Sequence, residues 1–257
     1  MKAAYKMNGN VALREVTLKE VGPEDLRIKV EACGICGTDL HKTPGGDQHE
    51  SPFGHEYTGT ILEMGSAVSG FRLGQRVMVE SSTPCGRSDN CRNARQELCF
   101  DVKSFFCTGT FGFAEEAIVP AITAIPYDGI SPEVATLSEP LGVAIDMVRL
   151  ADIRVYDTVV ILGMGPIGLM ALALAKKAGA RNVFVSNSKR RTGRAKAAMK
   201  FGATSCIDPR ETPLEKYDFG RPVDRVLVTA PPSTLNSAMK IASKGGIISY
   251  IGIEYGD

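Results

Sequence analysis

The feature that most limits the possible folds is one apolar segment in the second half of the chain, interrupted by glycines. The letters "TVVILGMG" (158–165) predict a buried strand that ends in a tight turn. The letters "PIGLMALALAKKAGA" (166–180) predict a helix that begins at a proline and ends with lysines and a glycine cap. Residues 159–175 are apolar but contain three Gly and a Pro, and they are fewer than the ~20 residues that a membrane span needs. We therefore expect a buried strand and a buried helix rather than a span.

The same order of strand, glycine turn and helix continues after residue 180. The segments "RNVFVSN" and "TSCID" predict strands on either side of a helix, "RRTGRAKAAMKFGA", and "PVDRVLVTA" and "GGIISYIGI" predict two more strands. Alternation of this kind builds a parallel sheet with helices on both faces. We therefore predict an α/β fold in which residues 151–257 form a doubly wound, Rossmann-type domain with five strands.

The first part of the chain has a different character, with short strands separated by Gly and Pro. In "DLRIKVEA" the apolar side chains alternate, which directs one set to the same face: Leu26, Ile28, Val30 and Ala32. The segment "GFRLGQRVMV" places turn residues Gly70 and Gly74 ahead of another strand. Residues 1–150 are therefore predicted to be a separate, β-rich domain with long loops.

The turn "GMGPIG" has the spacing of a dinucleotide-binding loop. Gly163 permits the tight turn, Gly165 lets the backbone approach a pyrophosphate, and Gly168 lets strand and helix pack closely. The helix N-terminus, which begins with Pro166 and Ile167, then favours the phosphate charge. A glycine-rich turn in any other parallel α/β domain would have the same letters. Its position between an apolar strand and a helix favours the dinucleotide.

The end of the next predicted strand bears on which nicotinamide cofactor binds. A NAD site usually has an Asp or Glu about 20 residues after the turn, where it binds the ribose 2′-hydroxyl. Here the chain instead has an uncharged side chain and a basic run: Asn187, Ser188, Lys189, Arg190 and Arg191. Because arginine can hold a phosphate in a bidentate fork, we predict NADP rather than NAD. The alternative is that Lys189 to Arg194 are the solvated start of a helix.

Four residues within the first 150 are candidate zinc ligands. Cys36 in "CGICGTDLH" and His55 in "GHEYTG" are ligands that suit zinc, and the adjacent Glu56 is a harder one. With Glu139 in "LSEPLGVA", they could form a site with few protein ligands and one open position. A catalytic zinc site needs such a position for its substrate.

Together these segments resemble the zinc-dependent medium-chain dehydrogenase/reductase family, the group of alcohol, sorbitol and threonine dehydrogenases. "CGICGTDLH", "GHEYTG", "VSGFRLGQRVMV", "SEPLGVA" and "GMGPIG" match family segments in family order over essentially the whole chain. The resemblance implies a GroES-like catalytic domain (1–150) and a Rossmann domain (151–257). It also implies hydride transfer between NAD(P) and a secondary alcohol, polyol or amino alcohol, or the matching ketone or aldehyde.

The resemblance further implies roles for single residues near the metal. Cys36 and His55 would be ligands of a catalytic zinc, and Glu56 would be a third ligand or a close neighbour. Glu139 resembles the acidic residue that reaches the zinc directly or through water. Asp39 would orient His55.

Two further residues would handle the proton of the alcohol. Thr38 lies where the family has the hydroxyl that accepts this proton, and His41 resembles a later member of the relay to solvent. Zinc lowers the pKa of a coordinated oxygen, so that the alcohol can lose its proton near neutral pH. Cys33 is interpreted as a packing residue rather than a ligand.

The segment "PCGRSDNCRNARQELC" resembles the structural zinc lobe of the family, which has four cysteines. Cys85, Cys91 and Cys99 occupy three of the four places, but Ser88 stands in the other. An alcohol does not replace a thiolate, so we expect weak zinc binding or none unless Asp89 or Cys107 completes the site. The alternative is that these are three ordinary thiols.

The family's nucleotide domain has six strands, whereas this chain ends after the fifth predicted strand. We therefore expect a truncated domain with an open sheet edge, and a homo-oligomer becomes doubtful. Two other functions are left open. One is a family member that uses zinc and cofactor for lyase or epimerase chemistry, and the other is a catalytically impaired protein that only binds nucleotide.

Charge and cysteine usage narrow the choice of partner and compartment. The 30 Lys and Arg nearly cancel the 29 Asp and Glu, which disfavours nucleic acid or an anionic membrane as the partner and favours a small molecule. Seven cysteines and an N-terminus with no apolar signal region argue against a secreted disulfide framework. We expect a cytoplasmic protein with reduced thiols.

Overall fold

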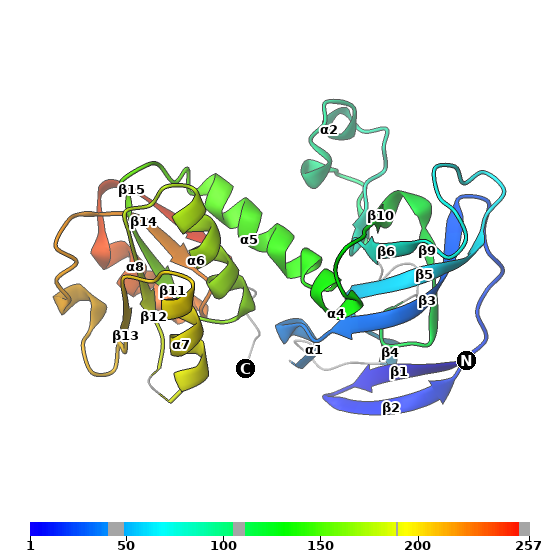
Figure 1. Cartoon of the computed structure of the whole chain (residues 1–257), viewed down its shortest axis with the longest axis horizontal. Helices are drawn as coiled ribbons and strands as arrows, with labels where there is room; N and C mark the ends of the chain where they lie inside the picture. Colours follow the sequence, from blue (N-terminus) through cyan, green and yellow to red (C-terminus); the bar gives the residue numbers. More distant parts are fainter. Residues whose placement is uncertain (41–48, 105–110, 189, 252–257) are drawn as a thin grey trace. The chain divides into compact units, whose positions relative to one another are not determined.

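The structure is a computed structural model, and it describes residues 1–40, 49–104, 111–188 and 190–251. The chain separates into two compact units, Met1–Glu139 and a second unit from Pro140 onward (Figure 1). The point of division falls inside a helix, α5 (Ser138–Leu150). The expected division after residue 150 stays a prediction.

The first unit is built on a five-stranded antiparallel sheet. Its strands lie in the order β10-β6-β5-β3-β9. They are β3 (Asp25–Gly34), β5 (Glu56–Met64), β6 (Arg76–Val79), β9 (Glu116–Pro120) and β10 (Ala124–Pro126). The alternation predicted for β3 is present, because Leu26 and Ile28 are fully buried and Val30 packs against the same core. The two turn glycines before β6 both have positive φ, at +81° for Gly70 and +75° for Gly74.

Smaller elements complete the first unit. A three-stranded sheet has the order β2-β1-β4, and β7 pairs with β8. These strands are β1 (Lys2–Met7), β2 (Asn10–Glu15), β4 (Ser51–Pro52), β7 (Ser82–Thr83) and β8 (Lys103–Ser104). The short helices are α1 (Gly37–Leu40), α2 (Asp89–Arg92), α4 (Pro132–Ala135) and the 3-10 turns η1 (Gln96–Leu98) and η2 (Ala121–Thr123).

The second unit has the predicted five-stranded sheet, and all its strand pairs are parallel. The order is β13-β12-β11-β14-β15. The strands are β11 (Thr158–Leu162), β12 (Asn182–Ser186), β13 (Ser205–Ile207), β14 (Val223–Val228) and β15 (Ala242–Tyr250). Every residue of β11 is buried, as expected for the centre of a sheet covered on both faces.

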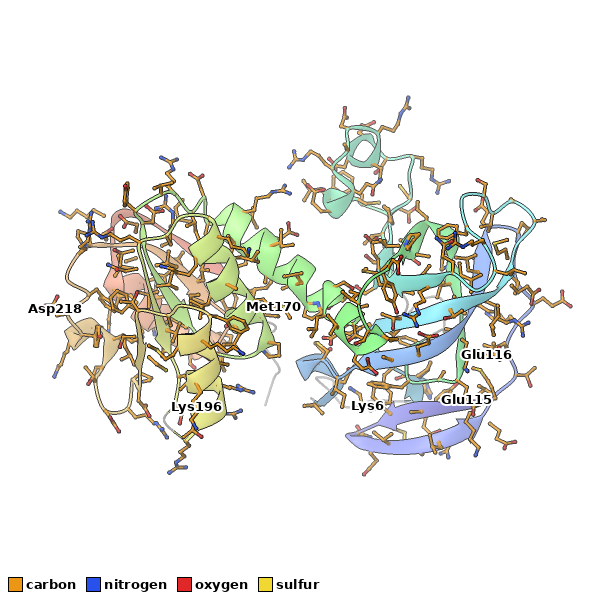
Figure 2. The ribbon with its side chains drawn as sticks, viewed as in Figure 1. Lys6, Glu115, Glu116, Met170, Lys196 and Asp218 are labelled. Atoms are coloured by element: carbon orange, nitrogen blue, oxygen red, sulfur yellow. The ribbon has the colours of Figure 1, made fainter. Side chains whose placement is uncertain are left out.

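Helices cover both faces of this sheet, which confirms the predicted doubly wound fold. One face packs against α5, α6 (Pro166–Lys177) and α7 (Thr192–Lys200), and the other against α8 (Leu235–Ile241) and η3 (Leu214–Lys216). A further 3-10 turn, η4 (Pro232–Thr234), precedes α8. Met170 of α6 packs against the core, whereas Lys196 of α7 is exposed (Figure 2). Among the described residues, no helix has the length and apolar character needed to cross a membrane.

Candidate active site

Three of the predicted zinc ligands lie together in the first unit. One ligand atom from each of Cys36, His55 and Glu56 lies within 4.8 Å of the others. Strand pairing explains this, because β3 and β5 are antiparallel neighbours and Gly34 lies opposite Glu56. Cys36 follows the end of β3, and His55 immediately precedes β5. Residues about twenty positions apart in the sequence therefore meet at one end of the sheet.

A glycine in β3 leaves the space that the Glu56 carboxylate occupies. A Cβ atom added at Gly34 would lie 2.3 Å from Oε2 of Glu56. Glu56 itself is 8% exposed, so its carboxylate is buried against the backbone of the neighbouring strand. The cross-strand pair thus directs the carboxylate toward Cys36 and His55.

Asp39 connects two of these residues. The backbone N–H of Cys36 donates to Oδ2 of Asp39 at 2.9 Å, and Oδ1 lies 3.8 Å from Nδ1 of His55. Lys6 Nζ donates to the backbone carbonyls of Thr38 and Asp39, both at 3.3 Å. These contacts hold α1 beside the three candidate ligands, and the role of Asp39 in orienting His55 stays a prediction.

The electrostatics of the cluster favour a bound cation. The hydrogen bond with Cys36 raises the pKa of His55 to about 9, although burial opposes it. Burial raises the pKa of the Glu56 carboxyl, and the charge of Glu139 raises it further. Nδ1 of His55 is buried and has no hydrogen-bond partner within the described residues. A thiol, an imidazole and crowded carboxylates are a ligand set that fits zinc, which would relieve the repulsion.

The other predicted site residues of this unit have different positions. Glu139 is in the first turn of α5, where Ser81 Oγ donates to its Oε1 at 3.4 Å, and it is not one of the three residues within 4.8 Å. Burial raises the pKa of its carboxyl. Thr38 is half-buried in α1, and His41 lies outside the described residues. Cys33 packs against the core of the first unit, and burial raises the pKa of its thiol to about 12.

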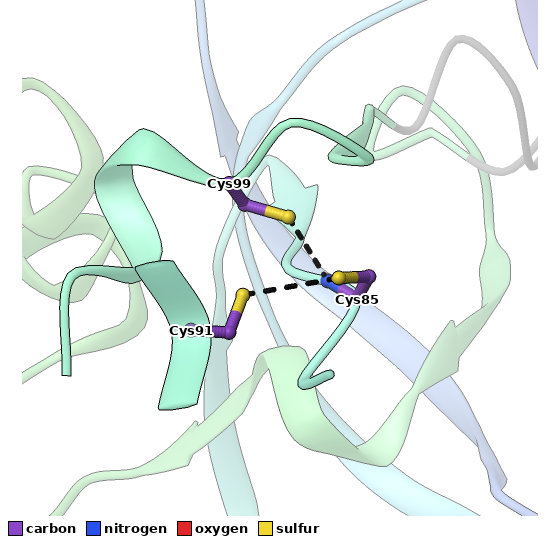
Figure 3. Close-up of side chains that lie close together, drawn as sticks. All are labelled: Cys85, Cys91 and Cys99. Atoms are coloured by element: carbon purple, nitrogen blue, oxygen red, sulfur yellow. Dashed lines mark hydrogen bonds between the residues drawn. The ribbon is translucent and has the colours of Figure 1, made fainter. Parts of the chain in front are cut away.

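The three cysteines of the lobe also converge, as Figure 3 shows. The sulfur atoms of Cys85, Cys91 and Cys99 all lie within 4.8 Å of one another. Ser88 caps α2, because its Oγ accepts the backbone N–H of Cys91 at 3.4 Å. Asp89 is exposed and is not part of this group, and Cys107 lies outside the described residues.

The glycine turn of the second unit borders a cavity of about 390 Å³ at the ends of the strands. Gly163 has a φ of +106°, and a Cβ at Gly168 would lie 2.1 Å from the carbonyl oxygen of Gly163. Gly165, the cap of α6, has nothing within 4 Å of such an atom, so the backbone is open to a ligand there. Pro166 and Ile167 form the first turn of α6, as predicted.

The predicted basic run lies beside this cavity. Asn187, Ser188 and Arg191 line it. Asn187 is 9% exposed, and its Nδ2 donates to the backbone carbonyl of Arg191 at 3.3 Å. Arg190 is exposed and donates its backbone N–H to Ser188 Oγ. Lys189 lies outside the described residues.

Sequence reasoning missed Arg210, which contacts Ser188 in the lining of this cavity. Arg210 follows β13 and forms a bidentate pair with Asp208, with Nε at 3.1 Å from Oδ1 and Nη2 at 2.8 Å from Oδ2. Its Nη2 also donates to Ser188 Oγ. The Asp208 side chain is 2% exposed, so the guanidinium is held by a buried carboxylate. A sequence signal was available, because the charged pair Asp208 and Arg210 comes directly after β13, the strand next to β12. Two other side chains were missed as well. Ser81 donates to Glu139, and Oγ1 of Thr229 donates to the carbonyls of Leu162 and Gly163.

Comparison with known proteins agrees with this geometry. Residues 22–129 match the model of the alcohol dehydrogenase GroES-like domain, and residues 166–257 match that of the zinc-binding dehydrogenase. L-threonine 3-dehydrogenase of Pseudoalteromonas translucida is 35% identical over 276 residues, which cover 100% of this chain and 79% of the relative. Sorbitol dehydrogenase of Bacillus subtilis is 36% identical over 269 residues, which cover 98% of this chain and 75% of the relative.

Two solved structures are similar over the whole chain. A protein described as a zinc-binding dehydrogenase from Sinorhizobium meliloti, bound to NADP, has a TM-score of 0.87 and 33% identity, covering 99% of this chain and 77% of that one. A protein described as a short-chain alcohol dehydrogenase from Escherichia coli, in complex with NADH, has a TM-score of 0.89 and 28% identity, covering 100% of this chain and 77% of that one.

A GroES-like unit with a cysteine, histidine and glutamate cluster, joined in sequence to a dinucleotide-type parallel sheet, defines a class of oxidoreductase. The chain belongs to the zinc-dependent medium-chain dehydrogenase/reductase family. It is accordingly an NAD(P)-dependent alcohol dehydrogenase of the zinc-binding kind. Its solved neighbours bind NADP in one case and NADH in the other, so they do not decide between the two cofactors.

Proposed function

We propose that the chain oxidises a small polyol or amino alcohol at a zinc held by Cys36, His55 and Glu56, with Glu139 nearby. The observation that carries this proposal is the convergence of the three side chains within 4.8 Å. The names of the relatives, a threonine and a sorbitol dehydrogenase, support the substrate class. Bound zinc would act as a Lewis acid on the substrate oxygen and lower its pKa.

The protein's own residues would hold and orient the reactants. Asp39 fixes the backbone of Cys36 and lies beside Nδ1 of His55, which would keep the imidazole turned toward the metal. The Thr38 hydroxyl would take the alcohol proton and pass it toward His41 and solvent. The hydride itself would go to the nicotinamide, whose redox chemistry belongs to the cofactor.

We propose further that NADP is preferred over NAD and that Arg210 contributes to this preference. Asp208 holds the guanidinium by Nε and Nη2, beside Ser188 at the end of β12. Within the described residues these bonds leave Nη1 available for a phosphate oxygen. Arg191 and Arg194 line the same cavity and add positive charge. A 2′-phosphate would therefore meet a guanidinium that is already oriented.

The cofactor proposal is tested by the dissociation constants of NADPH and NADH for the wild type and Arg210→Gln. We expect the variant to bind NADPH roughly tenfold to a hundredfold more weakly, because a hydrogen bond to a charged group is lost, and to bind NADH as before. Arg221→Gln, an exposed arginine of the same unit, is the matched control and should change neither constant. An equal loss for both cofactors, or tighter NADH binding by the wild type, would contradict the preference.

The metal proposal is tested by zinc content and by NADP⁺ reduction with L-threonine and sorbitol. The wild type should hold about one zinc per chain and His55→Ala should lose it, together with the activity. His49→Ala replaces an exposed histidine and should retain both. Zinc that survives the His55 substitution would place the metal elsewhere and remove the basis of the proposal.

A further inference from the structure

The three-cysteine lobe (Cys85, Cys91 and Cys99, with Ser88) is a second cluster of metal-binding side chains, formed by residues other than those of the catalytic cluster. Two of its sulfur atoms, those of Cys85 and Cys91, are 3.9 Å apart. Two thiolates bound to one ion at ~2.3 Å lie roughly 3.8 to 4.0 Å from each other in tetrahedral or trigonal geometry. The sulfurs of Cys85 and Cys91 are therefore already at the separation that a shared ion requires.

Backbone N–H groups hold two of the sulfurs in place. Cys99 Sγ accepts the N–H of Cys85 at 3.3 Å and that of Asp101 at 3.4 Å. Cys85 Sγ accepts the N–H of Ser88 at 3.3 Å. Such bonds fix the direction of each sulfur and offset the negative charge of a thiolate, as they do around other metal–thiolate sites.

The closed four-sulfur zinc site of the family does not fit these residues. Ser88 stands in the remaining place of the motif, and its Oγ accepts the N–H of Cys91 as the cap of α2. The same Oγ lies 3.9 Å from Cys99 Sγ. A serine hydroxyl is uncharged, and this one already accepts a backbone N–H, so it supplies no fourth anionic ligand. A structural zinc is almost always bound by four such ligands.

We infer that the lobe, as formed by the described residues, is a three-thiolate site for a soft, thiophilic cation of the Cu(I) class, with Ser88 outside the coordination sphere. Thiolates bind Cu(I) as well as zinc, but it is the closed tetrahedral four-sulfur set that is typical of zinc or an iron–sulfur centre, and three thiolates do not form that set. Cys85 and Cys99 are half-buried and Cys91 is buried, so an ion would enter from the side of the first two. The inference does not depend on the proposed dehydrogenase function, because none of its residues belongs to the catalytic cluster.

The experiment uses the full chain with Cys36→Ser and His55→Ala, which removes the catalytic cluster as a competing site. Cu(I) is added to the reduced protein without oxygen, in competition with a chromophoric Cu(I) chelator. We expect about one Cu(I) per chain, and Cys91→Ser and Cys99→Ser should each weaken binding at least about tenfold. Two cysteine variants are used because Cys91 is buried and its replacement alone could disturb folding. Cys206→Ser in β13 is the control and should bind as before.

Two substitutions at Ser88 separate this inference from the family's zinc site. Ser88→Ala should weaken Cu(I) binding by far less than the cysteine variants do, because it removes the cap of α2 and not a ligand. Ser88→Cys should complete four thiolates and tighten zinc binding by about tenfold to a hundredfold. The inference is overturned if Cys91→Ser and Cys99→Ser bind Cu(I) like the control or if Ser88→Ala loses it. It is also overturned if the wild-type lobe binds zinc as tightly as Ser88→Cys does.

Discussion

His55 links proton binding and metal binding at the level of a single residue. Its hydrogen bond with Cys36 raises its pKa to about 9, so the metal-free chain keeps this imidazole protonated at neutral pH. Zinc binds only the neutral form, and the proton therefore competes with the metal. Nδ1 of His55 lies 3.8 Å from Oδ1 of Asp39, so this carboxylate is placed to orient the imidazole.

The first prediction concerns the pH dependence of zinc affinity. As pH falls below about 9 the protonated fraction of His55 rises, and the zinc affinity of the metal-free chain should fall by roughly tenfold for each pH unit. Above that pH the contribution of His55 should level off. Competition with a chromophoric chelator between pH 7 and 10 measures this, with proton release recorded alongside. An affinity that is the same at pH 7 and pH 8.5 would show that His55 is not a ligand.

A second prediction at this scale concerns Gly34. Gly34→Ala places a methyl group 2.3 Å from Oε2 of Glu56, and the carboxylate must move away from Cys36 and His55. Zinc affinity should fall by about tenfold to a hundredfold while the fold is retained, because the nearest atom is the end of a flexible side chain and the Cβ of Glu56, at 3.1 Å, needs only a small shift. Gly37→Ala is the matched control, since nothing lies within 4 Å of the added atom there. Equal zinc affinities for the two variants would contradict the role given to this glycine.

At the scale of elements, local signals made much of the second unit predictable. The helix ends "KKAGA" and "MKFGA" place Gly179 and Gly202 just after α6 and α7, with φ of +101° and +93°. Each ending is closed by a local backbone bond, from the N–H of Ala180 to the carbonyl of Ala175 and from the N–H of Ala203 to that of Ala198. The β1–β2 hairpin turns at Asn8 and Gly9, which both have positive φ, and this Asn-Gly pair was an available but unused signal.

The candidate site was less predictable, because it depends on which strand ends become neighbours. Cys36 and His55 were identified through motifs that resemble a family, and strand pairing then explained their meeting. Arg210 had no such motif. Its position beside Ser188 follows from the order β13-β12-β11, which brings the ends of β12 and β13 together. Sequence patterns predict the strands, but they do not by themselves give the neighbour of each strand.

The third prediction concerns the contact between β14 and the segment that joins α5 to β11. Arg225 is 8% exposed, and its Nε and Nη2 donate to the backbone carbonyl of Asp152 at 3.1 and 3.0 Å. Its Nη2 also lies 3.4 Å from the carboxylate of Asp157. Arg225→Ala removes both hydrogen bonds to the Asp152 carbonyl and the ion pair with Asp157, whose Oδ2 then keeps only the backbone N–H of Arg154, and it should lower the free energy of unfolding by about 2 to 4 kcal/mol. Urea unfolding measures the free energy of unfolding, with the exposed Arg221→Ala as the control. A loss of stability in Arg225→Ala no larger than that of the control would contradict the prediction.

At the scale of the whole molecule, the two units have separate hydrophobic cores. Leu26, Ile28 and Tyr57 belong to a cluster confined to the first unit. The second unit has a cluster on each face of its sheet. Each unit therefore has a core of its own and can be stabilised separately by the ligand that it binds. Zinc would stabilise the first unit, and the nucleotide would stabilise the second.

The fourth prediction follows from this separation. NADPH at a hundred times its dissociation constant should stabilise the unit that binds it by about 2.7 kcal/mol, because the ligand binds only the folded state. Hydrogen exchange measured by mass spectrometry should therefore slow in β11 and β12 when NADPH is added, and it should change less in β3 and β5. Removal of zinc by a chelator should instead make exchange faster in β3 and β5, whose ends adjoin Cys36 and His55, and change β11 and β12 less. Equal changes in both units under either treatment would contradict this separation, because they would mean that the chain unfolds as a single cooperative body.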